Sequence, residues 1–98
     1  MSTLIERTYY ILKQAELTTT RQAFSRDYVG KNQNWFAYQT HMKRDFPLTA
    51  AIQCLHSLRL VRERDAAFDL VQLCALSEVE HLLLKHLNEE HWVAEVVA

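Results

Sequence analysis

Residues 25–47 read SRDYVGKNQNWFAYQTHMKRDFP, and they contain both the only glycine and the only proline of the 98-residue chain. Gly30 and Pro47 flank a segment that is rich in aromatic and amide side chains and basic at its end. A residue just beyond a helix often needs a positive φ, which glycine adopts without steric cost. Proline disfavours helical geometry in the residue before it. The stretch therefore predicts one helix that ends at Gly30 and another that ends before Pro47.

The rest of the chain has the composition of a helical domain. Hydrophobic residues make up 49% and charged residues 23%, which is typical of a globular protein and not of a disordered one. A single glycine and a single proline leave almost no turn chemistry for β-hairpins. Because there are no repeats, low-complexity tracts or linkers, we expect residues 1–98 to form one all-α domain.

Apolar residues that recur at helical spacing predict five or six helices. Their expected ranges are about 3–16, 20–28, 33–44 and 48–60, then a helix around 68–74 and a last one over 77–98. Two pairs, Thr19 with Gln22 and Ser77 with Glu80, match capping boxes, in which each side chain bonds the other residue's free backbone N–H. These boxes predict the starts of the second and the last helix.

The expected last helix carries more apolar residues than one narrow stripe needs. They are Val79, Leu82, Leu83, Leu84, Leu87, Trp92, Val93, Val96 and Val97. A helix with so wide an apolar surface indicates a partner, and the simplest partner is a second copy of the chain. The sequence therefore predicts a homodimer through residues 77–98.

The cysteines and the N-terminal residues predict the compartment. Cys54 and Cys74 lie within apolar helical patterns, which predicts buried free thiols in a reduced cytoplasm. The N-terminal residues carry charges within their apolar pattern and lack a small-residue cleavage site, unlike a signal peptide. No apolar run approaches the ~18 residues of a membrane span. We expect a cytoplasmic protein that does not enter a membrane.

Neither catalysis nor metal binding is predicted. His81, His86 and His91 recur every five residues, which scatters them around a helix and does not gather them on one face. One glycine cannot build a phosphate-binding loop, and no nucleophile motif is visible. We therefore expect no enzyme activity, no cofactor and no metal.

Several features between residues 19 and 60 follow one another in a characteristic order. They are Thr19 and Gln22, the pair Phe24-Ser25, the pair Val29-Gly30, the polar run 31–34, then Phe36, Pro47 and the row Ile52, Leu55 and Leu58. In this order they resemble the lambda-repressor/Cro-type helix–turn–helix family. The segment Phe24–Gly30 followed by Trp35-Phe36 is also similar to small bacterial proteins of unknown function. The first resemblance implies a five- or six-helix domain of the lambda-repressor-like class, with an additional C-terminal helix.

The segment departs from the family in two ways. The distance from Phe24-Ser25 to Gly30 is one residue longer than usual, so the turn is either extended or pivots on Val29. In the second register Trp35, and not Phe36, becomes the buried residue. In addition, Leu48 follows Pro47 where the family favours a capping serine.

The resemblance implies binding to double-stranded DNA. In this class of motif, the first residues of the second helix contact base edges while flanking groups hold phosphates. Gln33 and Asn34 would read bases, because their amides can pair with adenine, with Trp35 or Tyr38 beside them. The residues expected to contact phosphates are Arg21, Gln22, Lys31, Lys43 and Arg44, and Asn32 belongs to the same expected DNA-binding surface. Two copies would address half-sites about one helical turn apart.

The charge distribution fits such a surface. Between Arg21 and Arg44 five basic residues stand against Asp27 alone, a local excess of +4 within a chain of net charge −1. An acidic body with one basic region is typical of a protein that faces phosphates. The sequence therefore favours a small DNA-binding transcriptional regulator. The alternative is a protein-interaction module that kept the fold and lost DNA binding, with an exposed aromatic side chain as its contact residue.

Overall fold

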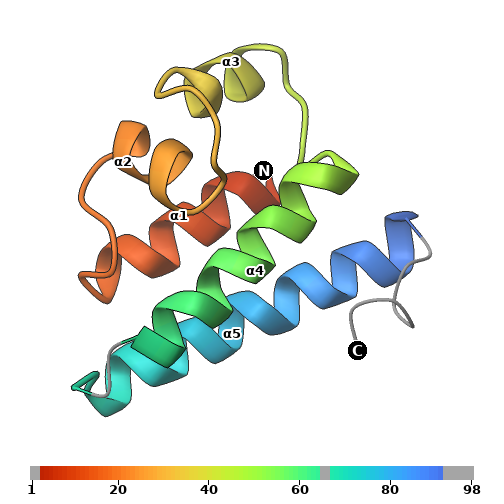
Figure 1. Ribbon diagram of the computed structural model, residues 1–98. Coiled ribbons are helices and arrows are strands. Elements are labelled where there is room, and N and C mark those ends of the chain that lie inside the picture. Colours follow the sequence, from red (N-terminus) through yellow and green to blue (C-terminus); the bar gives the residue numbers. More distant parts are fainter. Residues whose placement is uncertain (1–2, 65–66, 92–98) are drawn as a thin grey trace.

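The computed structural model describes residues 3–64 and 67–91 (Figure 1). Its elements are α1 (Leu4–Gln14), α2 (Arg21–Asp27), α3 (Trp35–His41), α4 (Leu48–Arg64), α5 (Leu70–His86) and the short π-helix η1 (Leu87–His91). Every regular element within these ranges is a helix, which confirms the predicted all-α class. No helix within them is both long and apolar enough to cross a membrane.

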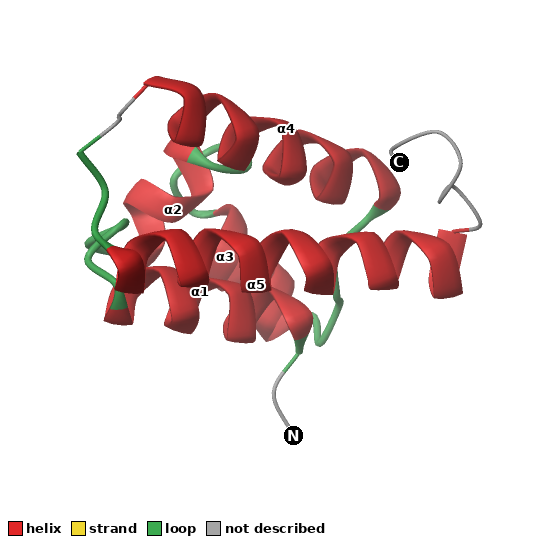
Figure 2. Ribbon diagram, turned by 90° about the horizontal axis from the view of Figure 1, so that it is seen from below, coloured by secondary structure: helices red, strands yellow, loops and turns green. Residues whose placement is uncertain are grey.

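Helix α5 packs against both α1 and α4, while α2 and α3 pack against each other. Figure 2 shows α4 and α5 running side by side, with α1 next to α5. All five α-helices contribute to one buried core, which includes Ile5, Leu12, Phe24, Phe36, Leu55, Leu58, Leu76 and Leu83. Each fully buried side chain of this size stabilises the fold by about 1.5–3 kcal/mol relative to its exposed state.

The start of α1 is fixed by residues from two parts of the chain. Thr3 and Glu6 form a capping box at this end. Asp45, in the loop after α3, accepts hydrogen bonds from the backbone N–H groups of Leu4 at 3.0 Å and Ile5 at 3.2 Å. A carboxylate at a helix N-terminus satisfies these free donors and complements the helix dipole. Asp45 thereby ties the connection between α3 and α4 to α1.

The sequence misplaces the helix boundaries in the second half of the chain. Residues 70–86 form one helix, so the expected break before Ser77 is wrong. Asp69 caps α5, and Gln72 completes a capping box with it. Helix α5 gives way to η1 at Leu87, and the apolar residues expected beyond position 91 lie outside the described residues.

Ser77 and Glu80 lie inside the continuous helix α5, so they cap no helix, and both contact α4. Arg62 donates a hydrogen bond to the Ser77 hydroxyl at 3.2 Å and forms an ion pair with Glu80 at 3.0 Å. The same two residue types at the same spacing thus join α4 to α5. A similar one-residue error occurs at α2, where Thr20 in place of Thr19 accepts the capping hydrogen bond, from the N–H of Ala23 at 3.0 Å.

The two cysteines have different environments. Cys54 is fully buried, as predicted, and burial raises the pKa of its thiol far above the ordinary value. Cys74 is exposed, so its predicted burial is wrong. The apolar pattern around Cys74 misleads because Leu70, Val71 and Leu73 are exposed as well.

Candidate nucleic-acid interface

Ser25 joins α2 to the start of α3. Its hydroxyl donates a hydrogen bond to the carbonyl of Arg21 at 3.0 Å and accepts one from the N–H of Phe36 at 3.1 Å. Asn34 occupies the N-cap position of α3 but makes no side-chain capping bond. A free N–H in the first turn of α3 is therefore satisfied from the neighbouring helix. Since Ser25 is fully buried, this contact sets where α3 begins relative to α2.

The connection between α2 and α3 spans residues 28–34, which is longer than the three or four residues of a typical helix–turn–helix. Gly30 has φ of 69°, as its place after a helix predicts. The N–H of Lys31 bonds the carbonyl of Ser25 at 2.9 Å, and the N–H of Asn34 bonds the side-chain oxygen of Asn32 at 2.8 Å. These bonds hold the polar run in turns, so the expected helix start at Gln33 is wrong and α3 begins two residues later.

Phe36, and not Trp35, is the buried aromatic residue of α3. Its ring lies 5.3 Å from that of Tyr9 and 6.1 Å from that of Phe24, in edge-to-face geometry. Trp35 is half-buried and packs against Phe46, with the ring centroids 5.9 Å apart. Of the two registers that the sequence left open, the one with Phe36 in the core is therefore present. On the outer surface of α3, Tyr38 remains 54% exposed.

The other residues expected to contact DNA are all exposed. Lys31, Asn32, Gln33 and Asn34 precede α3, while Lys43 and Arg44 follow it. Because α3 has seven residues, these two groups lie about 10 Å apart along its axis. Amide side chains therefore precede one short helix and basic side chains lie at both of its ends, on the side of the molecule that carries α2 and α3 in Figure 1.

Lys43 holds an unusual backbone conformation, with φ of 57°. The N–H groups of Lys43 and Arg44 bond the carbonyls of Thr40 at 3.1 Å and Gln39 at 2.9 Å. This is the Schellman arrangement that ends many helices, in which the left-handed position is usually glycine. A lysine is strained in this conformation, and its charged side chain follows directly after α3.

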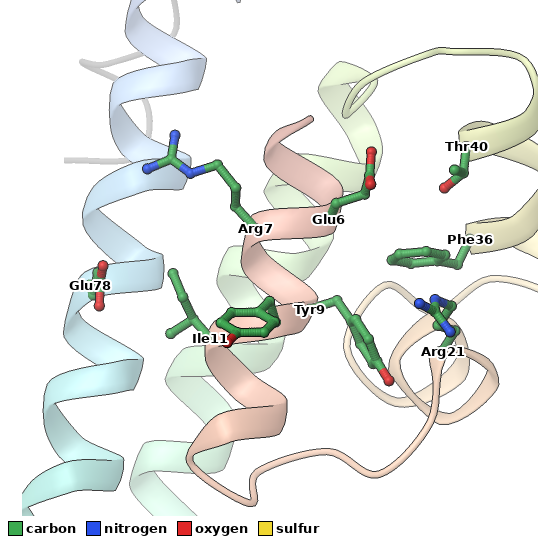
Figure 3. A pocket seen from close by; sticks show the side chains of 9 residues that line it. Glu6, Arg7, Tyr9, Ile11, Arg21, Phe36, Thr40 and Glu78 are labelled. Carbon is green, nitrogen blue, oxygen red and sulfur yellow. The ribbon is translucent and has the colours of Figure 1, made fainter. Parts of the chain in front are cut away.

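Arg21 faces a groove beside α1. Its guanidinium lies 5.3 Å from the centre of the Tyr9 ring and 5.5 Å from that of Phe36. The groove has a volume of about 570 Å³, and Figure 3 shows Arg21, Phe36 and Thr40 on one side of α1 and Glu78 of α5 on the other. Stacking on two rings holds the guanidinium in place while leaving it exposed.

Tyr28 is a buried polar residue that connects two parts of this region. Tyr28 donates a hydrogen bond to the carbonyl of Leu17 at 2.8 Å, which ties the α2–α3 connection to the end of α1. Burial, with smaller contributions from Cys54 and Asp27, raises the pKa of Tyr28 to about 12. Within the described ranges no three His, Cys, Asp or Glu side chains gather as metal ligands.

Two features of the structure escape the sequence analysis. The capping of α1 by Asp45 joins residues 40 positions apart, and no local pattern indicates it. The exposed apolar residues at the start of α5 do leave a signal. Leu70, Val71, Leu73 and Cys74 occupy four of its first five positions, more than one buried face can hold.

Comparison with known proteins identifies a family. Residues 5–96 match a family described as "Family of unknown function (DUF6626)". Neither the curated proteins nor the solved structures contain a match. The matched residues include all five α-helices apart from the first residue of α1. The chain therefore belongs to this family of unknown function, DUF6626.

Proposed function

We propose that the protein is a small DNA-binding regulator that contacts double-stranded DNA through α3 and the loops on either side of it. The observation that carries the proposal is the placement of exposed amide side chains before α3 and of exposed basic side chains at both of its ends. The segment 21–44 bears a local charge of +4 within a chain of −1. Such a basic region favours a polyanion, since neutralising phosphates releases their bound counterions.

In this proposal α2 and α3 act as a helix–turn–helix with an extended connection. Gln33, Asn34 and Tyr38 face base edges, and Lys31, Lys43 and Arg44 face phosphates. A single α-helix fits the major groove, which is about 12 Å wide. Because Gln33 and Asn34 lie in a fixed turn and not on the helix, they contact bases from the loop ahead of α3. A dimer would read two half-sites.

Salt-dependent binding tests the proposal. We expect fluorescence anisotropy with labelled genomic duplexes to show binding that weakens steeply as salt increases. The double variant Lys43→Gly/Arg44→Ala should lower the slope of log affinity against log salt by about 2, because it removes two phosphate contacts. Glycine is chosen because Lys43 has a positive φ that alanine would strain.

Arg64→Ala is the matched control. Arg64 is exposed and ends α4, about 24 Å along that helix from the loop that carries Lys43. It removes the same type of charge outside the proposed surface and should leave the slope unchanged. Absence of binding at low salt, or an equal loss in both variants, would refute DNA recognition by α3.

A protein-interaction module is the second candidate. Tyr38, on α3, and Met42, its C-cap residue, lie four positions apart and are 54% and 44% exposed. Such a pair occupies one side of a helix and suits a protein contact as well as it suits a base. If this candidate is right, the duplexes remain unbound at every salt concentration, and Tyr38→Ala abolishes the capture of a partner protein that Lys43→Gly/Arg44→Ala retains.

A further inference from the structure

The second half of α1 and the start of α5 form an exposed apolar surface, which we name the α1/α5 face. Its large side chains and their exposed fractions are Tyr10 62%, Leu70 75% and Val71 66%. A hydrogen bond of 3.2 Å from the Gln72 amide to the carbonyl of Ala15 holds the start of α5 against the end of α1. The exposed thiol of Cys74 lies in the same surface.

A groove of about 470 Å³ runs between the two helices on this face. Its lining includes Tyr10, Ile11, Val71 and Cys74, and Glu78 is the only charged residue among the described residues that line it. A surface with so little charge at its centre resembles the core of a protein–protein interface more than a site for a polar ligand. A protein surface of matching apolarity is therefore the expected occupant.

The area of the face fits a dimer. Given the exposed fractions above, its three large side chains present about 300–500 Å² of apolar surface, since each would present roughly 150–250 Å² if fully exposed. A standard interface buries about 800 Å² on each partner, and a little over half of that is apolar. The face therefore supplies the apolar part of one such interface without any residue outside the two helices.

We propose that the α1/α5 face binds the same face of a second copy, in a two-fold symmetric dimer. Two-fold dimers are the commonest oligomers, and each copy then covers the other's groove. The proposal relocates the dimer contact expected from the sequence, from residues 77–98 to the opposite end of α5. It also deepens the proposed function, because Figure 3 shows α5 and α3 on opposite sides of α1, which leaves both copies of α3 uncovered.

The mass in solution tests the dimer without DNA. We expect light scattering or sedimentation to show a dimer that dissociates on dilution. Val71→Asp should raise the dissociation constant at least tenfold, because it buries an unpaired carboxylate in the apolar interface. The monomer should stay folded, since Val71 is exposed and an acidic residue in the first turn of α5 complements the helix dipole. Circular dichroism and urea unfolding check that it does.

Leu48→Asp is the matched control. Leu48 is also an exposed apolar residue in the first turn of a helix, α4. Figure 1 shows the starts of α4 and α5 at opposite ends of the molecule. The same chemical change there should leave the dissociation constant unchanged. If both variants dissociate the dimer equally, the assignment of the interface is wrong.

Cys74 gives a second readout. Cys54 is fully buried, so a maleimide should label only Cys74 in the folded protein. We expect its labelling rate to fall as the protein concentration passes the dissociation constant, and to remain fast at every concentration in Val71→Asp. A chain that stays monomeric at the highest concentration, with Cys74 equally reactive throughout, overturns the proposal, as does a different protein that protects Cys74 in place of a second copy.

The failures of the two proposals are distinguishable. If the chain is a monomer that binds DNA with a steep salt dependence, the dimer is refuted and the proposed function stands. If it is a dimer through the α1/α5 face that binds no duplex, the reverse holds. Each measurement therefore gives an independent answer.

Discussion

Helices α2 and α3 with their connection form the α2–α3 unit, residues 21–41, which lies on the opposite side of α1 from the α1/α5 face. The two regions differ in how far their apolar side chains are buried. In the α2–α3 unit Phe24 and Phe36 are buried against Tyr9, and the outer surface is largely polar or charged. On the α1/α5 face Leu70 and Val71 remain exposed although they begin a well-capped helix. The first surface is complete within one chain, whereas the second is the kind of surface that another protein covers.

The largest expected effect comes from the interior of the α2–α3 unit. Phe36→Ala removes a buried ring that contacts both Tyr9 and Phe24, so the free energy of unfolding should fall by about 3–5 kcal/mol. Leu70→Ala makes a similar truncation on the α1/α5 face and should cost under about 0.5 kcal/mol in the monomer. Urea unfolding at low protein concentration measures both. If both variants lower the free energy of unfolding by a similar amount, Leu70 is not an exposed residue that the fold can lose.

A smaller loss in the free energy of unfolding is expected where the Ser25 side chain of α2 accepts a hydrogen bond from the backbone of α3. Ser25→Ala leaves the buried N–H of Phe36 without its partner, which should cost about 1–3 kcal/mol. Ser77→Ala removes an exposed hydroxyl that accepts from Arg62 and should cost much less. Hydrogen exchange at the Phe36 amide separates the two, because only Ser25→Ala should speed it. Unchanged exchange there would show that Ser25 does not hold α3.

The sequence predicts those features that depend on local backbone chemistry. Gly30 takes the positive φ that its position after a helix requires, and Pro47 separates α3 from α4. Ser77 and Glu80 mislead because a capping box and a contact with a neighbouring helix need the same side chains at the same spacing. The helix starts instead at the capping box of Asp69 and Gln72, and the contact of Ser77 with Arg62, fifteen residues earlier, leaves no local pattern.

The candidate site shows the same limit. The sequence places the exposed polar residues around α3, but Asn32 bonds the N–H of Asn34 and so excludes the polar run from the helix. Cys74 and Val71 lie in an apolar run that predicts burial, yet periodicity does not say whether the covering surface belongs to the same chain. Burial in a monomer and burial in a dimer leave the same pattern in a sequence.

The smallest expected effect is a gain in stability at the edge of the α2–α3 unit. Lys43 has φ of 57°, a conformation that disfavours side chains with a Cβ, so Lys43→Gly should stabilise the fold by up to about 1 kcal/mol. Glu16 ends α1 in the same way, with φ of 60°, and Glu16→Gly should give a similar gain. Thermal unfolding measures both, and a loss of stability in either would contradict the strain. If Lys43 contacts phosphate, only Lys43→Gly weakens DNA binding while it stabilises the protein. Loss of DNA binding together with a gain in stability would then show that Lys43 is kept for binding, despite its strained backbone, whereas Glu16 is not.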